Sequence, residues 1–437
     1  MYDIDYQNLS IVKVSDASNS VAKSVALNIA GDWAPISGQI SDVFIEKQKT
    51  FYGDIEPYFK NADLNIANLE TVIDAKQRNH RKGASKLIDS PEVLSSLVSI
   101  NMHLLCLANN HIMDNGAEGV RQTLHHLKER KLSFVGAGLS RQEIYSPYFF
   151  EKDGQKIAII NTAEGEEANE KYNNNCGASD IESYHIIDQI RECKNKGYFT
   201  ILIAHAGAEF IPVPPPHIRD LYRTFAAEGA DMVVGHHPHV PQGLEIYQDT
   251  PIFYSIGHFG IFRRHSSRKM EKVGFIINFT IVNQQIETLN MVPYQISASG
   301  LQELRGTTLD SFRVMIKKSS DYIQNQTMLS QVWKEYIFFR YPLLELKDIV
   351  SSYRFDDIAS YVQQVNLMVQ FSRRLMYLPR MAINKFEHAD YLKEFGCVKK
   401  LTWRDKFFLA QKNMLYLPNR IANKAFSVLR KIKKSFS

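Results

Sequence analysis

Short apolar runs alternate with longer amphipathic stretches between about residues 22 and 300, and this alternation constrains the fold more than any other feature. The runs have the length and β-branched content of strands. They are SVALNIA, LNIANLE, HLLCLAN, KIAIINT, TILIAHA, DMVVGHH, IFYSIGHF and GFIINFTIV. Several intervening stretches, such as 116–130 and 216–230, have helical periodicity. The pattern predicts a mixed α/β fold.

Most of these runs end in polar side chains that can take part in chemistry. In chain order they are Asp32, Glu70, Asn109, Asn110, His111, His205 and the histidines of GHHPHVPQG at 235–243. Because open α/β sheets build their sites at the carboxyl ends of strands, we expect these side chains to converge.

The segment 235–243 holds three histidines within four positions, His236, His237 and His239. A lone histidine after a strand is usually a structural residue, but three together favour a function. Alternate residues of an extended segment point the same way, so we expect His237 and His239 to reach one point in space. A metal site requires such convergence.

The candidate ligands combine carboxylate, amide and imidazole groups, which suit Mn, Fe or Zn and argue against a thiolate site. They are numerous enough for one or two divalent ions. Two such ions can activate a bridging water and hold the oxygens of a phosphoryl group. Glu70 is the natural bridge, because its carboxylate offers two oxygens.

Each candidate also has a plain structural explanation when taken alone. Asp32 could cap a helix, Glu70 could be a surface acid at a strand end, and Asn109 and Asn110 could form a turn. His205 alone would more often be structural. These explanations would have to hold independently at several strand ends, which favours the common site.

Seven sequence blocks carry a resemblance to a known family: GDWAP, NLETVI, LANNHIMDNG, VGAG, AHAGAEF, GADMVVGHHPHVPQGLEIY and FYSIGHFGIF. Over about residues 22–295 the chain resembles the CapA family of capsule and poly-gamma-glutamate synthesis proteins, which are similar to calcineurin-like metallophosphoesterases. The resemblance implies a four-layer αββα sandwich. It implies the metal ligands Asp32, Glu70, Asn110, His205, His237 and His239. It also implies that His111 protonates or stabilises the leaving oxygen.

The chain departs from the pattern of the wider superfamily at two places. Metallophosphoesterases typically begin with Asp-x-His, but Asp32 is followed by Trp33 and Ala34, so one imidazole ligand of the first metal is absent. CapA-like sequences commonly share that loss. The usual YSxGNF block reads YSIGHF, with His258 in place of asparagine, and the sequence leaves open whether His258 compensates.

Further residues are predicted to support the ligands or to contact a substrate: Asn109, Asp114, Glu209, His236, His258, Arg263 and Arg264. Asp114 would fix the loop after His111, and Glu209 would accept a hydrogen bond from a ligating histidine. The basic segment FRRHSSRK at 262–269 is either a solvated loop or a contact for a phosphate or polyanion.

Changes in composition and charge along the chain suggest where its regions begin and end. We divide the chain into an N-terminal extension (1–21), a CapA-like domain (22–300) and a helical region (301–437) that ends in a basic amphipathic helix. Residues 397–437 hold eleven Lys and Arg against one acid, although the whole chain carries a net charge of only +5. This tail either lies against an anionic membrane surface or packs on its own domain. Nucleic acid binding is not expected, because no recognised module accompanies the charge.

Four widely spaced cysteines, without a CxxC pair, fit a reducing compartment. With no recognisable export signal or long apolar stretch, we expect a cytoplasmic protein, with peripheral contact at the inner membrane face through the tail. Two functions remain open. One is metal-dependent phosphoesterase-type hydrolysis in the synthesis of a capsule, exopolysaccharide or poly-gamma-glutamate. The other is a non-catalytic subunit that binds or assembles an anionic surface polymer.

Overall fold

The computed structural model describes residues 1–13, 23–35, 51–74, 87–164, 168–261, 272–297 and 299–335, and the structural statements below concern these residues. The chain divides into two compact units, Met1–Tyr341 and Pro342–Ser437. The fold described here is that of the first unit. The predicted basic tail at 397–437 and the predicted substrate contacts Arg263 and Arg264 lie outside the described residues.

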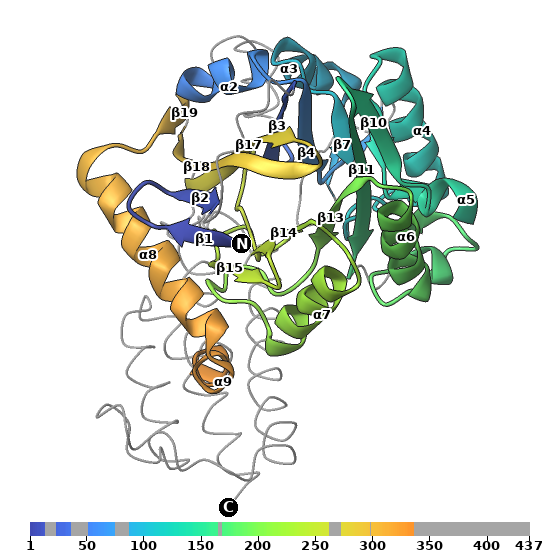
Figure 1. The fold of residues 1–437 in the computed structure, drawn as a ribbon. Coiled ribbons are helices and arrows are strands. Elements are labelled where there is room, and N and C mark those ends of the chain that lie inside the picture. Colours follow the sequence, from blue (N-terminus) through green and yellow to red (C-terminus); the bar gives the residue numbers. More distant parts are fainter. Residues whose placement is uncertain are drawn as a thin grey trace, which may run out of the picture. The chain divides into compact units, whose positions relative to one another are not determined.

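The larger sheet contains nine strands and is mixed (Figure 1). Its order is β1 (Tyr2–Asp5), β2 (Ser10–Lys13), β18 (Gln285–Ser297), β17 (Val273–Val282), β3 (Val25–Trp33), β4 (Leu64–Leu69), β7 (Leu104–Cys106) and β8 (Ser133–Val135), and β19 (Gly300–Glu303) also pairs with β18. From β3 to β8 the neighbours are parallel, whereas β17 runs antiparallel to β3. The carboxyl ends of β3, β4 and β7 therefore lie along one edge of the sheet.

The second sheet contains six strands, in the order β10 (Tyr148–Lys152), β11 (Gln155–Ala163), β13 (Phe199–His205), β14 (Met232–His236), β16 (Thr250–Phe253) and β15 (Leu244–Tyr247). The central neighbours β11, β13, β14 and β16 are parallel. Two short pairs complete the strands, β5 (Val72–Ile73) with β6 (Ile88–Asp89) and β9 (Ala137–Gly138) with β12 (Gly177–Ala178).

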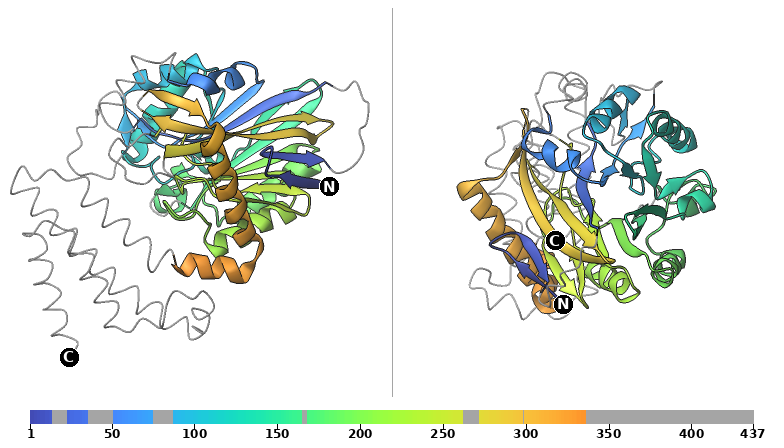
Figure 2. Two further views of the ribbon diagram at one scale, coloured as in Figure 1. Left: turned by 90° about the vertical axis from the view of Figure 1, so that its left-hand side faces the viewer. Right: turned by 45° about the horizontal axis from the view of Figure 1, so that its top comes forward.

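Helices cover the outer faces of the two sheets (Figure 2). They are α2 (Glu56–Lys60), α3 (Leu94–Ser99), α4 (Gly116–Glu129), α5 (Arg141–Ile144), α6 (Tyr184–Asn195), α7 (Pro216–Ala227) and α9 (Gln326–Glu335), with short 3-10 turns at Gly53–Ile55, Pro91–Val93 and Glu170–Tyr172. α8 (Gly306–Gln324) instead contributes Phe312 and Ile316 to the apolar cluster between the sheets. α4 is amphipathic because Val120, Leu124 and Leu127 recur at helical spacing and are buried.

Three apolar clusters account for the packing. One lies between the sheets and joins side chains such as Ile29 and Ile66 of the larger sheet to Ile201 and Val234 of the smaller. A second packs α2, α3 and α4 on the larger sheet, and a third packs α6 and α7 on the smaller. Burial on both faces explains why the central strands read as almost continuous apolar runs.

The mixed α/β prediction is confirmed, and each of the eight apolar runs contributes residues to a strand or to an isolated bridge. The sequence interpretation missed β18, whose alternating polar residues interrupt its apolar pattern, and α6. Residues 1–13, within the predicted N-terminal extension, form a hairpin whose second strand pairs with β18.

α8 belongs to the helical region predicted from residue 301 onward, and it contacts the segment that follows the histidine cluster. The Gly243 N–H donates to Ser319 Oγ at 2.8 Å, and the Leu244 N–H donates to Ser320 Oγ at 3.0 Å. A Cβ on Gly243 would lie 2.4 Å from the backbone nitrogen of Ser320, so the helix can approach this closely only because the residue is glycine.

Candidate metal centre

A β-bulge at the end of β3 sets the position of Asp32. The β3 to β4 register pairs Ala30 with Ala67 and then Asp32 with Asn68, so Gly31 is the extra residue. A Cβ on Gly31 would lie 2.0 Å from the carbonyl oxygen of Gly257, which only glycine avoids. The bulge turns the Asp32 carboxylate toward the ends of the smaller sheet.

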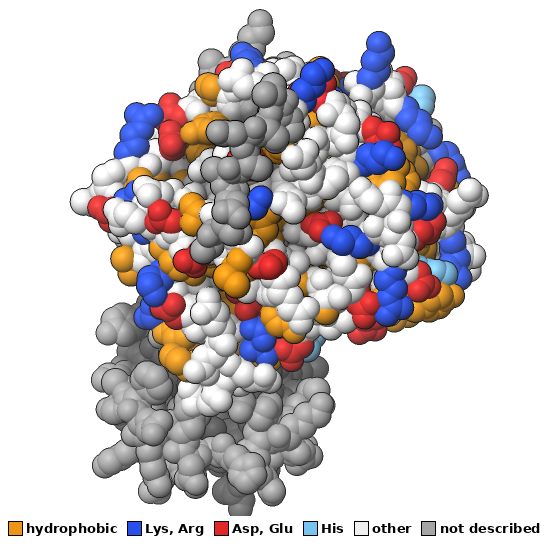
Figure 3. Space-filling model, viewed as in Figure 1, with side chains coloured by type: hydrophobic (Ala, Val, Ile, Leu, Met, Phe, Trp, Pro, Cys, Tyr) orange, Lys and Arg blue, Asp and Glu red, His pale blue; other side chains and the backbone are white. Residues whose placement is uncertain are grey.

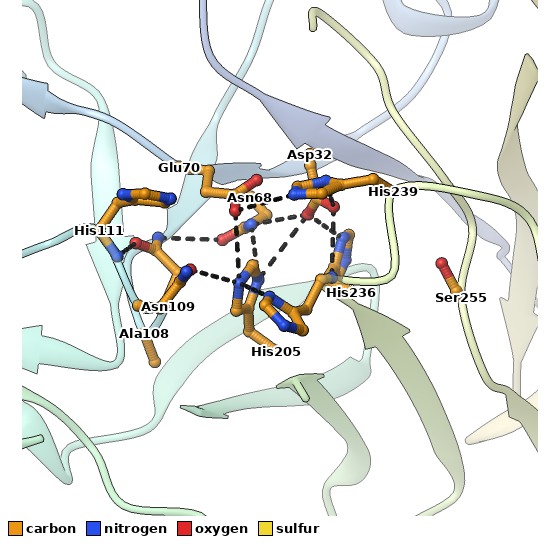
Figure 4. A network of polar contacts seen from close by, with 12 residues as sticks. Asp32, Asn68, Glu70, Ala108, Asn109, His111, His205, His236, His239 and Ser255 are labelled. Atoms are coloured by element: carbon orange, nitrogen blue, oxygen red, sulfur yellow. Dashed lines mark hydrogen bonds and ion pairs between the residues drawn. The ribbon is translucent and has the colours of Figure 1, made fainter. Parts of the chain in front are cut away.

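The fully buried Asp32 carboxylate is held by several donors (Figure 4). Asn68 Nδ2 donates to Asp32 Oδ1 at 2.7 Å, and His236 Nδ1 lies 3.0 Å from the same oxygen. The His237 backbone N–H donates to Oδ2 at 3.2 Å, and His239 Nδ1 lies 3.2 Å from Oδ2. Residues from β3, β4 and the end of β14 therefore meet at one carboxylate.

A second group of donors surrounds Nε2 of His205, the last residue of β13. Asn110 Oδ1 and His237 Nδ1 each lie 3.0 Å from this nitrogen, and Glu70 Oε1 lies 3.5 Å from it. A ring nitrogen carries at most one hydrogen, which cannot fully serve both the amide oxygen of Asn110 and the carboxylate of Glu70. A divalent cation could be bound by all of these donors, so the group fits a metal ion.

Among the described residues, two buried groups of side chains could hold metal ions, and together they include every predicted ligand except Asn110. Glu70, His205 and His237 form the Glu70 cluster, to which Asn110 is adjacent through His205. Asp32, His239 and His258 form the Asp32 cluster. Glu70 Oε1 lies 3.5 Å from His239 Nε2 as well as from His205 Nε2, so this carboxylate reaches toward both clusters. The bridging position predicted for Glu70 is compatible with this geometry.

The buried site shifts the pKa values of its groups in different directions. Burial alone would raise the pKa of Asp32, but hydrogen bonds from His236 and His239 and their charges hold it well below its usual range. Burial and the neighbouring His237 lower the pKa of His205 well below its usual value. The neutral imidazole that results is the form that binds metal ions.

His237 and His239 have different electrostatic environments. Burial lowers the pKa of His237, although the charge of Glu209 opposes this effect. Burial also disfavours the charged form of His239, but the carboxylates of Glu70 and Asp32 outweigh it and raise the pKa to about 9. The predicted hydrogen bond from Glu209 to a ligating histidine stays a prediction, but its charge acts on both histidines.

The sequence predicts that His237 and His239 lie in an extended segment and point the same way, and this prediction is wrong. Neither residue is extended: φ is 95° at His237 and 59° at His239, both in the left-handed region. The chain turns sharply after β14, and the two ring centroids lie 6.0 Å apart. The two histidines therefore belong to different clusters instead of meeting at one point. Unfavourable backbone angles of this kind concentrate at functional sites.

His111 lies beside the clusters at the more open side of the site. Its Nδ1 is 2.9 Å from Asp114 Oδ2, and its backbone N–H donates to Asn109 Oδ1 at 3.1 Å. His111, Asn110 and His237 are partly exposed, whereas Asp32 and Glu70 are fully buried. Solvent or a substrate would reach the site from the side of these three residues.

Asn68 is a site residue that the sequence interpretation missed. Its Nδ2 contacts both Asp32 Oδ1 and, at 3.1 Å, His205 Nδ1, and its Oδ1 accepts a bond from Asn109 Nδ2 at 3.3 Å. Asn68 therefore links the two sheets at the centre of the site. The available signal was its place two residues before Glu70, because alternate residues near a strand end share a face.

The family model described as bacterial capsule synthesis protein PGA_cap matches residues 26–263, which is more than half of the chain. The chain belongs to this family.

Two curated relatives of the family agree with that assignment. The PGA biosynthesis protein CapA of Bacillus subtilis is 32% identical over 212 residues, covering 47% of this chain and 55% of the relative. The capsule biosynthesis protein CapA of Bacillus anthracis is 26% identical over 275 residues, covering 61% and 66%. The matched region thus spans less than two thirds of either relative.

Among solved structures, a putative 5'-nucleotidase from Staphylococcus aureus matches 68% of this chain and 58% of its own, with 13% identity and a TM-score of 0.39. Among the helices that the structure describes, none is long and apolar enough to cross a membrane.

Proposed function

We propose that this member of the capsule synthesis family is a metal-dependent hydrolase of the phosphoesterase type, built on a metallophosphoesterase-like αββα sandwich. The observation that carries the proposal is the pair of buried donor clusters at the carboxyl ends of strands from both sheets, with a histidine–carboxylate pair at their open side. Two carboxylates, an amide oxygen and imidazoles are the donors that Mn, Fe or Zn prefer.

The chain's own residues have distinct tasks in this proposal. Bound ions would supply a hydroxide at neutral pH and neutralise the charge that develops on a phosphoryl group. Asp114 fixes the ring of His111 through Nδ1 and leaves Nε2 to face the substrate. His111 Nε2 then donates a proton to the leaving oxygen. Asn68 and His236 hold the Asp32 carboxylate in place.

The substrate we propose is an anionic surface polymer or a phosphoester formed during its synthesis. The names of the Bacillus relatives, which refer to capsule and PGA biosynthesis, support this choice. On the face drawn in Figure 3, acidic and basic side chains are interspersed, and no single charge dominates. We therefore place polymer recognition at the site itself rather than on that face.

The cell compartment proposed is the cytoplasm, with contact at the inner membrane face through residues 397–437. Liposome sedimentation of the full chain and of a chain ending at residue 396 tests this contact. Pelleting of the full chain alone supports it, and equal pelleting of both contradicts it.

A non-catalytic subunit that binds or assembles the polymer is the second candidate. The observation in its favour is Ala34, which occupies the position of the first imidazole of the Asp-x-His pattern. A site with a weakened first metal could recognise an anion without hydrolysing it.

The experiment that separates the two candidates measures hydrolysis of glycerophosphoethanolamine, a phosphodiester whose alkyl leaving oxygen needs a proton, by protein loaded with Mn²⁺, with a His111→Asn variant alongside. General acid catalysis contributes roughly 10²–10⁴-fold, so we expect a loss of that size without loss of bound metal. His126→Asn on α4 is the matched control and should retain full turnover. Metal-loaded wild-type protein without turnover would favour the binding subunit.

A further inference from the structure

His258 lies beside Asp32 in the tertiary structure although the two are far apart in the sequence. An isolated parallel bridge pairs them. The Asp32 N–H donates to Gly257 O at 3.1 Å, and the Phe259 N–H donates to Asp32 O at 2.7 Å. These bonds flank His258 on both sides. Residues paired across a ladder project their side chains to the same side, so the His258 ring lies on the side of the Asp32 carboxylate.

The His258 ring also lies against His239. The two ring centroids are 4.5 Å apart with an interplanar angle of 20°, and both side chains are almost fully buried. One ligand atom from each of Asp32, His239 and His258 lies within 4.8 Å of the other two. This separation allows all three residues to bind one ion.

The position that normally supplies an imidazole beside the first carboxylate cannot do so in this chain. That position is Ala34, which is fully buried in an apolar cluster with Leu87 and Ile261. The Asp32 cluster must therefore obtain its second imidazole from elsewhere. His258 reaches it from a segment whose backbone bridges both to Asp32 and, through Gly257, to Gly274 of β17.

The geometry points to His258 as a direct metal ligand that replaces the missing Asp-x-His imidazole, so that Asp32, His239 and His258 bind the first ion. The Glu70 cluster, with Asn110, binds the second. This inference rests on the proposed metal-dependent function, and it assigns a ligand role to a histidine that stands where the family pattern has asparagine. With His258 as a ligand, the first metal site is not weakened by Ala34, which was the observation in favour of a non-catalytic subunit.

The test is metal stoichiometry, measured by mass spectrometry after equilibrium dialysis against Mn²⁺, for wild type, His258→Phe and His237→Asn. Phenylalanine keeps a ring against His239 but has no ligand nitrogen. We expect two ions in the wild type and one in each variant, with the affinity for the lost ion lowered at least about 10–100-fold, the effect of losing even an outer partner of a metal ligand. The electron paramagnetic resonance spectrum should change from that of a coupled manganese pair to that of an isolated ion.

Controls separate ligation from packing and folding. His125→Phe removes an imidazole from the exposed group of His125, His126 and Glu129 on α4 and should leave two ions bound. If His258→Phe does not fold, as judged by thermal unfolding in EDTA, His258→Leu replaces it, because leucine also lacks a ligand atom, and the same loss of affinity is expected.

The inference is overturned if His258→Phe, or the Leu variant, keeps both ions at wild-type affinity, because the ring would then only pack on His239. It is also overturned if the wild type binds one ion that His237→Asn removes. Neither result bears on hydrolysis, which the His111 variant tests separately. The wild type could instead bind two ions, lose one in His258→Phe and show no turnover. That result would support the inference and contradict the proposed catalysis.

Discussion

The two donor clusters differ in how the chain assembles them. Much of the Glu70 cluster comes from side chains at the ends of β4 and β13, where parallel strands bring local sequence positions to a common edge. The Asp32 cluster depends on a bulge at Gly31 and on a backbone bridge to His258. One half of the site therefore follows from strand ends, whereas the other requires a particular register between distant segments.

The largest effect is expected where the two clusters meet. Glu70→Gln removes the carboxylate that approaches both His205 and His239, and with it the charge that offsets two cations. We expect both ions to bind at least about 100-fold more weakly, measured by titration calorimetry with Mn²⁺. Glu129→Gln in the exposed group on α4 serves as the control. Loss of one ion alone would show that Glu70 belongs to a single cluster.

A smaller and selective effect is expected at His236. Its Nδ1 contacts Asp32 Oδ1 at 3.0 Å, so His236→Asn should loosen that carboxylate and weaken the ion of the Asp32 cluster about 10–100-fold. The ion of the Glu70 cluster should change little. Calorimetry that resolves the two binding events checks this, and equal weakening of both ions would argue against separate clusters.

The β-bulge at Gly31 is expected to affect the stability of the fold as well as the metal site. Gly31→Ala places a methyl group against the carbonyl oxygen of Gly257, which is backbone and cannot swing away. We expect the free energy of unfolding to fall by about 1–3 kcal/mol, measured by urea denaturation of metal-free protein. The ion of the Asp32 cluster should also be weakened more than the other. Gly154→Ala is the control for a glycine with no atom near its Cβ, although its positive φ adds a small cost of its own. Unchanged stability and metal binding would mean that the bulge does not set the site.

The smallest effect is expected at the start of β4, away from the carboxyl ends that form the site. Asp63 accepts the Ala26 N–H at 2.8 Å and pairs with Lys152 of the other sheet. Burial would raise the pKa of Asp63, but the bonds from Lys152 and Ala26 hold it below its ordinary value of 3.8. Asp63→Asn should cost at most about 1 kcal/mol at pH 7, because the pair is partly exposed.

The pH dependence of that cost follows from the direction of the shift. Because the folded pKa lies below the unfolded one, the stabilisation is complete well above pH 3.8 and declines as the pH falls through the folded value. The difference in unfolding free energy between wild type and Asp63→Asn should therefore shrink below pH 3.8. A difference that stays constant from pH 7 to pH 3 would contradict this.

The sequence by itself determined the α/β class and the strand ends that carry Asp32, Glu70 and His205. Apolar runs and the polar residues that follow them are local features, because a strand buried on both faces needs apolar residues at consecutive positions. Asn110 also follows one of these apolar runs, and its oxygen lies 3.0 Å from His205.

The division of the site into two clusters could be seen only in the tertiary structure. The left-handed turns at His237 and His239, the contact of Asn68 with Asp32 and the bridge between Asp32 and His258 depend on packing between the sheets. No periodicity encodes them, because the register between distant segments is set by the fit of whole elements rather than by neighbouring residues. For that reason the sequence shows only that His258 replaces an asparagine, whereas the fold shows that His258 lies beside Asp32.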